Sequence, residues 1–170
     1  MMEKPNKETY RIISKGGVGE FSILDAAGEH VAVFSYKGWF SSTGSASTDQ
    51  GRITIKSKDK WQTSFVVQRS RKNIGEIVFN WRGNIVIGLK DLHDTVCQFL
   101  LEDSGHSKWA LKDAKGHVLL TMQLQSHWSK KNSEYKVELR KKPAVYIDEL
   151  LIVCGYATNL NNSKVAALKG

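Results

Sequence analysis

The sequence predicts an all-β protein with one central helix, in which a closed antiparallel β-barrel of about twelve strands surrounds a buried C-terminal hydrophobic helix. Three observations lead to this fold class: alternating apolar and polar residues, turn sequences at regular spacing, and a closing segment more apolar than the rest. Of the 170 residues, 41% are hydrophobic and 25% are charged. Such a chain is expected to form one domain, residues 1–170, with a substantial core.

The strands are predicted from period-two alternation between residues 10 and 140. In EIVFNW (76–81) and SEYKVELR (133–140), every second residue is apolar and most of the others are polar. One apolar face and one polar face are typical of antiparallel strands that cover a core on one side. The first nine residues, MMEKPNKET, are predicted to be a short disordered extension.

Turn-like sequences separate these strands and predict tight hairpins, because Asp, Asn and Gly favour turn conformations. They are KGGVG (15–19), DAAG (25–28), KDK (58–60), WRGN (81–84), DSGH (103–106), DAKG (113–116) and SKKNS (129–133). A Ser/Thr/Gly-rich stretch, SSTGSASTDQ (41–50), is predicted to be a longer flexible loop. Segments 21–34 and 109–122 share an aromatic start, a D-A-x-G turn and an apolar strand, which indicates either a duplication or two hairpins of one type.

The closing segment AVYIDELLIVCGYAT (144–158) predicts a helix over residues 145–158. Residues 150–157 contain no charge or amide, so this helix is apolar on every side and must be buried on every side. Asp148 and Glu149 suit the positive end of the helix, and Asn159 suits its C-cap. The segment is too short to cross a membrane, which takes about 20 apolar residues. A sheet with an apolar inner face can bury such a helix by closing around it.

In this order of features the chain resembles the tubby C-terminal-like superfamily, which includes tubby domains, phospholipid scramblases and plant LURP-one-related proteins. The resemblance covers residues 10–160 and rests on the strand count, the D-x-x-G turns at 25–28 and 113–116, and the terminal PAVYIDELLIVCGYATNL. It implies about twelve antiparallel strands around a hydrophobic C-terminal helix and, from tubby domains, phosphoinositide binding through basic residues. No basic residue is matched to a position here, and the cysteine cluster and calcium motif of scramblases are missing. The alternative is an unrelated β-sandwich or calycin-like barrel with the helix outside.

The sequence contains no arrangement of residues that predicts catalysis. The five histidines include no pair at the i, i+4 spacing of a helical zinc site, and the two cysteines lie singly in apolar runs. His93 and Asp94 are adjacent in KDLHDT, where a solvated turn explains them better than a catalytic pair. We therefore predict a protein that is not an enzyme, with no catalytic residue, metal ligand or cofactor. The cysteine usage and the absence of an apolar leader in MMEKPNKETY favour a cytoplasmic location, peripheral at a membrane if lipid is bound.

Positive charge is concentrated in two segments. The formal net charge is +8, and residues 56–72 hold six basic residues and one acidic residue, while residues 130–142 hold six basic and two acidic residues. Concentrated positive charge predicts an anionic partner. The leading hypothesis is a binding module for anionic, phosphoinositide-like lipid headgroups at a membrane surface, and the alternative is a protein-interaction or structural module without a small ligand. Specific nucleic-acid binding is not expected, because the aromatic residues needed for base stacking lie mostly in apolar runs.

An up-and-down order of strands places alternate turns at the same rim of the barrel. One rim then collects the turns at 59–60, 82–83 and 104–105 and the loop 126–132. The predicted anionic-ligand residues of this rim are Lys58, Lys60, Arg82, Lys130 and Lys131, and its predicted membrane-interface residues are Trp61, Trp81 and Trp128. Tryptophan beside lysine and arginine is typical of a membrane–water interface.

The opposite rim is the weaker candidate. It is predicted to hold Arg69, Arg71, Lys72 and the basic run 140–142 beside Asp91, Asp94 and Asp113, and it lacks tryptophan. For the first rim, the alternative interpretation is that Trp61 and Trp81 plug the barrel end while the lysines only solvate its turns.

Overall fold

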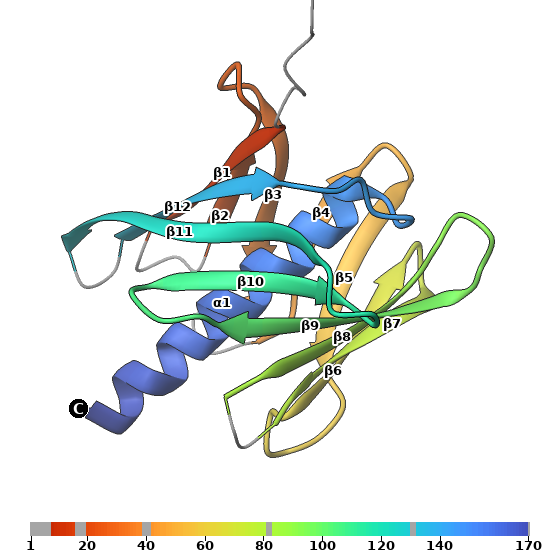
Figure 1. The fold of residues 1–170 in the computed structure, drawn as a ribbon. Helices are drawn as coiled ribbons and strands as arrows, with labels where there is room; N and C mark the ends of the chain where they lie inside the picture. Colours follow the sequence, from red (N-terminus) through yellow and green to blue (C-terminus); the bar gives the residue numbers. More distant parts are fainter. Residues whose placement is uncertain (1–7, 16–19, 39–41, 81–82, 130–131, 170) are drawn as a thin grey trace, which may run out of the picture.

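The structure, a computed structural model, describes residues 8–15, 20–38, 42–80, 83–129 and 132–169 and contains both the barrel and the helix (Figure 1). Twelve strands precede one helix, α1 (Ile147–Lys169), in the described part of the chain. The strands are β1 (Thr9–Lys15), β2 (Glu20–Leu24), β3 (His30–Tyr36), β4 (Gly44–Thr48), β5 (Gly51–Ser57), β6 (Ser64–Arg69), β7 (Lys72–Phe79), β8 (Ile85–Lys90), β9 (Val96–Asp103), β10 (Lys108–Asp113), β11 (Val118–Ser129) and β12 (Asn132–Leu139).

The sheet is a closed antiparallel barrel. Every strand pairs with its neighbours in sequence, and β12 also pairs with β1, for example through Ile12 and Tyr135. The inward-facing residues of the strands are mostly apolar, as in β12, where Tyr135 and Val137 are buried and Lys136 between them is exposed. The predicted closed barrel of about twelve strands is therefore confirmed, and the β-sandwich alternative is excluded.

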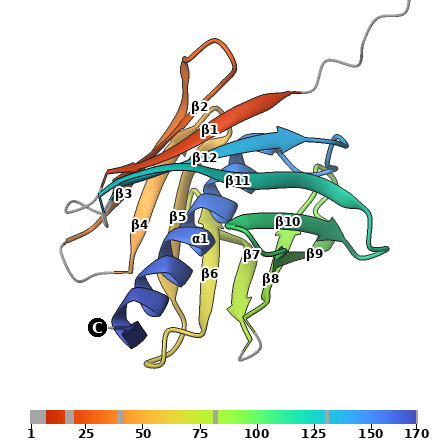
Figure 2. The same cartoon turned by 60° about the vertical axis from the view of Figure 1, so that its left-hand side comes forward.

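Helix α1 runs through the middle of the barrel, as Figures 1 and 2 show from two sides. Residues 150–157 are all buried, so the apolar segment lies where its composition requires. The predicted end of the helix at residue 158 is wrong, because α1 continues to Lys169. Asn159 does not cap the helix; its Oδ1 accepts a hydrogen bond from the Ser14 hydroxyl at 2.8 Å. Asn162 donates to the Tyr135 hydroxyl at 3.1 Å, so these amides contact the barrel while the helix continues.

The stretch 41–50 is not the flexible loop that its composition predicts. Residues 44–48 form strand β4, which pairs with β3 and β5 and carries two buried positions, Gly44 and Ala46. Gly44 has no room for a side chain, because a Cβ there would overlap the ring of Phe34 and the backbone carbonyl of Ser35. The small residues that predicted a flexible loop allow this strand to lie close to the aromatic core, as Gly44 does beside Phe34.

The two D-A-x-G segments are hairpins with the same turn. Asp25 Oδ1 accepts hydrogen bonds from the amides of residues 27 and 29, and Asp113 Oδ1 accepts the same pair from residues 115 and 117. In each turn the glycine has a positive φ, 81° at Gly28 and 86° at Gly116, as a three-residue hairpin loop requires. The hairpins are β2–β3 and β10–β11, which are eight strands apart in a ring of twelve. A duplication of the barrel would separate them by half the ring, so the shared turn explains the likeness.

The strand order defines two rims. We call the end at which the even-numbered strands finish, and at which α1 begins, the entry rim; the end at which the odd-numbered strands finish is the exit rim. The loop 58–63 and the turn 104–107 lie at the exit rim, and the C-terminal end of α1 also emerges there (Figure 2). The turns that contain Asp91, Asp94 and Arg71 lie at the entry rim, as predicted.

The close approach of α1 to the barrel wall at Gly155 gives a test of the packing. A Cβ at Gly155 would lie 2.7 Å from Cε2 of Phe21, whose ring is fully buried and stacked on Phe34. Although alanine favours a helix over glycine by about 1 kcal/mol, overpacking costs about 1–3 kcal/mol. We therefore expect Gly155→Ala to lower the free energy of unfolding in urea by about 1 kcal/mol. In a Phe21→Leu background the substitution should instead stabilise the protein, and an equal effect in both backgrounds would contradict this packing.

Candidate functional site

The loop 58–63 joins β5 to β6 at the exit rim and is held together by its own polar groups. The Asp59 carboxylate accepts hydrogen bonds from the Thr63 hydroxyl at 2.6 Å and the Thr63 amide at 3.1 Å. These contacts, the hydroxyl first, hold the pKa of Asp59 below its usual range, so the carboxylate stays ionised at neutral pH. The amide of Lys58 donates to the carbonyl of Ser64 at 2.9 Å and closes the base of the loop. The loop therefore has a defined shape before any partner arrives.

This braced loop presents Trp61 to solvent. Trp61 is 81% exposed. The other large hydrophobic residues that are exposed in the described part of the chain, Leu92 and Val96, are less exposed than Trp61. A tryptophan side chain removes a large apolar area from water when it contacts a partner. An exposed tryptophan on an ordered loop is therefore typical of a binding surface. The alternative interpretation, in which Trp61 and Trp81 plug the barrel end, is wrong for Trp61, which lies outside the core.

Three of the predicted site residues lie together on this loop. Lys60 is exposed beside Trp61, whereas Lys58 Nζ contacts Glu76 Oε2 of β7 at 3.0 Å. The backbone of Trp128 lies in β11 close to its exit-rim end, but its side chain is outside the described residues. The remaining predicted residues, Trp81, Arg82, Lys130 and Lys131, also lie outside the described residues.

Three of the five tryptophans, Trp61, Trp109 and Trp128, have a described backbone, and each lies in a segment at the exit rim. Trp61 lies in an exit-rim loop, Trp109 is the second residue of β10, which starts there, and Trp128 is next to the end of β11. Trp39 and Trp81 lie outside the described residues. The sequence segments between strands at the entry rim contain no tryptophan. Trp109 is buried and so serves the core, whereas Trp61 is exposed.

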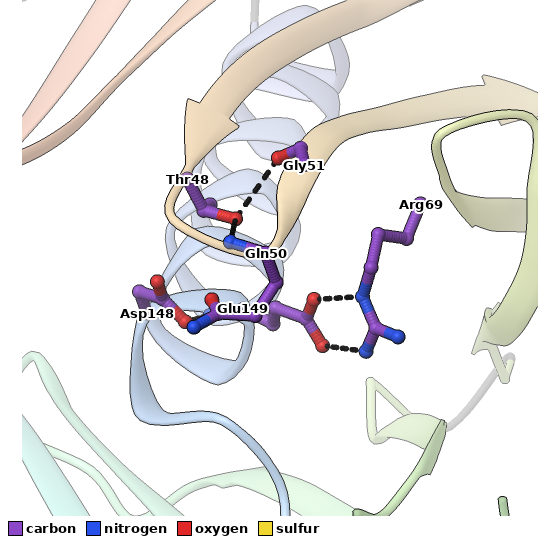
Figure 3. Close-up of polar contacts among 6 residues, drawn as sticks. All are labelled: Thr48, Gln50, Gly51, Arg69, Asp148 and Glu149. Carbon is purple, nitrogen blue, oxygen red and sulfur yellow. Dashed lines mark hydrogen bonds and ion pairs between the residues drawn. The ribbon is translucent and has the colours of Figure 1, made fainter.

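The entry rim contains an ion pair that the sequence analysis missed. The Arg69 guanidinium donates from Nε to Oε2 of Glu149 at 2.6 Å and from Nη2 to Oε1 at 2.7 Å, the two parallel contacts drawn in Figure 3. The Glu149 side chain is 1% exposed and that of Arg69 is 23% exposed. The hydrogen bond to Glu149 raises the pKa of Arg69 above its usual value, and the guanidinium also lies 5.2 Å from the centre of the Tyr146 ring.

A sequence signal for this pair exists. Arg69 follows Phe65 and Val67 at alternate positions of β6, which both point into the barrel, so the arginine begins on the inner face. Glu149 directly precedes the apolar run of a helix that is buried on every side. A buried acid therefore needs a cation from the wall, and Arg69 is an inward-facing cation on that wall.

The other candidate groups of the sequence occupy ordinary turns. The His93 amide donates to Asp91 Oδ1 at 2.7 Å, so the KDLHDT segment is a braced turn. Within the described residues no three His, Cys, Asp or Glu side chains lie close enough to hold a metal ion. A surface hollow of about 400 Å³ is lined by His30, Asp49 and Asp148, among others, at the entry rim. Burial raises the pKa of Asp148 there. The described part of the chain has no helix long and apolar enough to span a membrane.

Comparison with models of known protein families, with curated proteins and with solved structures finds no match to this chain. The resemblance to the tubby C-terminal-like superfamily therefore rests on the sequence features themselves. Function must be argued from the geometry of the two rims.

The ion pair at the entry rim predicts a specific stability defect. Arg69→Met would leave Glu149 buried and without a partner, so we expect the free energy of unfolding at pH 7 to fall by about 3–5 kcal/mol. The double variant Arg69→Met/Glu149→Met should recover most of the loss, since apolar replacement of a whole buried pair is often neutral. Chemical denaturation at pH 7 measures the stability of both variants; a single variant as stable as wild type would refute the assignment.

Proposed function

We propose that this protein is a non-enzymatic binding module that docks on anionic lipid headgroups at a membrane surface through its exit rim. The observation that carries the proposal is Trp61, 81% exposed beside the exposed Lys60 on a loop braced by Asp59. Tryptophan favours the headgroup level of a bilayer, where its ring is partly buried and its N–H stays hydrated. A cation next to it meets lipid phosphate at the same depth.

The ordered loop supports this function in energetic terms. A flexible loop loses conformational freedom when it docks, and this cost subtracts from the affinity. The hydrogen bonds within loop 58–63 have already fixed its shape, so little further ordering is needed when Trp61 inserts. Each cation near an acidic bilayer contributes about 1 kcal/mol, so a few lysines and one tryptophan give weak, reversible and salt-sensitive binding.

Vesicle binding tests the proposal. Wild-type protein should co-sediment with phosphatidylcholine vesicles that contain phosphatidylserine or a phosphoinositide, more weakly as salt is raised, and not with phosphatidylcholine alone. Glutamine at Lys58, Lys60, Arg82, Lys130 and Lys131 should abolish binding, and Lys60→Gln alone should weaken it about fivefold, since about 1 kcal/mol per cation corresponds to that factor. Trp61→Ala should weaken binding without removing its salt dependence.

The matched control moves the same change of charge to the other rim. Lys141→Gln/Lys142→Gln removes two exposed entry-rim cations, as Lys58→Gln/Lys60→Gln removes two from the exit-rim loop. Only the exit-rim pair should weaken binding, and both variants should melt like wild type because all four side chains are exposed. Wild-type protein that ignores acidic vesicles at low salt refutes the proposal and leaves Trp61 as an anchor for a protein partner. If both double variants lost the same amount of vesicle binding, net charge alone and not the exit rim would explain the interaction.

A further inference from the structure

Lys58 is held away from the surface that the exit rim would present. Its ammonium group contacts Glu76, which lies on the outer wall of β7, three residues before that strand ends at Phe79. Three strand residues span roughly 10 Å, so the contact directs the Lys58 side chain down the barrel wall and away from the rim. Lys60, two residues further along the loop, is exposed with no ion pair among the described residues.

We propose that Glu76 restrains the docking surface by competing with lipid phosphate for Lys58. This inference rests on the proposed function and concerns the regulation of the same rim. With Lys58 paired, the loop offers one lysine beside Trp61; with Lys58 released, it offers two. Glu76 thereby sets how dense the negative charge of a bilayer must be before the protein docks.

The exposure of the ion pair makes the restraint reversible. The side chains of Lys58 and Glu76 are 47% and 50% exposed, so water and salt screen their attraction and the pair is weak. A bilayer rich in acidic lipid brings many phosphates within reach of one ammonium group, whereas Glu76 brings a single carboxylate. Exchange of partners therefore depends on the lipid composition, which a buried and rigid ion pair would not allow.

The opposite end of the wall offers a matched ion pair. Lys136 Nζ lies 3.5 Å from Glu138 Oε1 on β12, with side-chain exposures of 49% and 32%, and Glu138 is one residue from the entry-rim end of its strand. Glu138→Gln changes the net charge by the same amount as Glu76→Gln and also releases one lysine. It does so away from the exit rim, so it separates a local effect from a general electrostatic one.

The experiment measures binding to phosphatidylcholine vesicles with increasing fractions of phosphatidylserine at low salt. Glu76→Gln should bind up to about fivefold more tightly than wild type, the gain of one engaged cation, and should reach half-maximal binding at a lower phosphatidylserine fraction. Glu138→Gln should bind like wild type. In a Lys58→Gln background, Glu76→Gln should give little further gain, because no lysine is left to release.

The outcomes separate the inference from the function on which it rests. If wild type binds and Glu76→Gln is no tighter than Glu138→Gln, the restraint is refuted while the docking function stands. An undiminished gain in the Lys58→Gln background would also refute it, since simple removal of a repelling carboxylate would then explain the effect. If neither wild type nor Glu76→Gln binds acidic vesicles, the proposed function fails and this inference fails with it.

Discussion

A helix that is apolar on every side has no polar face that could lie against water, and the rest of the structure depends on burying it. An open sheet or a sandwich covers one side of a helix, whereas a closed ring of strands covers all of them and also leaves no strand edge unpaired. Residues 150–157 of α1 are buried without exception. Missing side chains make the close packing possible, at Gly44 of β4 beside Phe34 and at Gly155 of α1 beside Phe21. The helix thus occupies the centre of the barrel, where other β-barrels hold a ligand.

Apolar packing alone would allow α1 to slide along its axis or rotate inside the barrel. Polar contacts at both ends of the helix oppose these motions. At the entry rim, Glu149 bonds to Arg69 through two parallel contacts. Towards the exit rim, the Tyr156 hydroxyl donates to the carbonyl of Ser42 at 2.8 Å, and Asn159 accepts from Ser14. Each bond is directional, so together they fix the depth and the rotation of α1 in a way that apolar contacts do not.

The sequence predicted the fold because its decisive signals are local. Alternation and Asp/Gly turns mark strands and hairpins, and a charge-free run marks a buried helix. The features that the sequence did not predict depend on contacts between residues that are far apart in the chain. Strand β4 has the composition of a loop and becomes a strand only between β3 and β5. Asn159 resembles a helix end until Ser14 is placed beside it. Of the predicted site, Lys58, Lys60 and Trp61 do share a loop, but Glu76, which holds Lys58, lies on another strand.

The two rims differ in how their charges are already used. At the entry rim, the inward-facing cation Arg69 is neutralised by Glu149, and the half-buried Asp148 stands near the exposed Asp49, while Lys141 and Lys142 are exposed. At the exit-rim loop the acid is Asp59, whose oxygens are turned into the loop by Thr63 and Ser64. Its charge shapes the loop from within, and Lys60 and Trp61 remain outside. Both rims therefore have exposed cations, and the loop at the exit rim differs in that an exposed tryptophan, Trp61, lies beside its exposed lysine, Lys60.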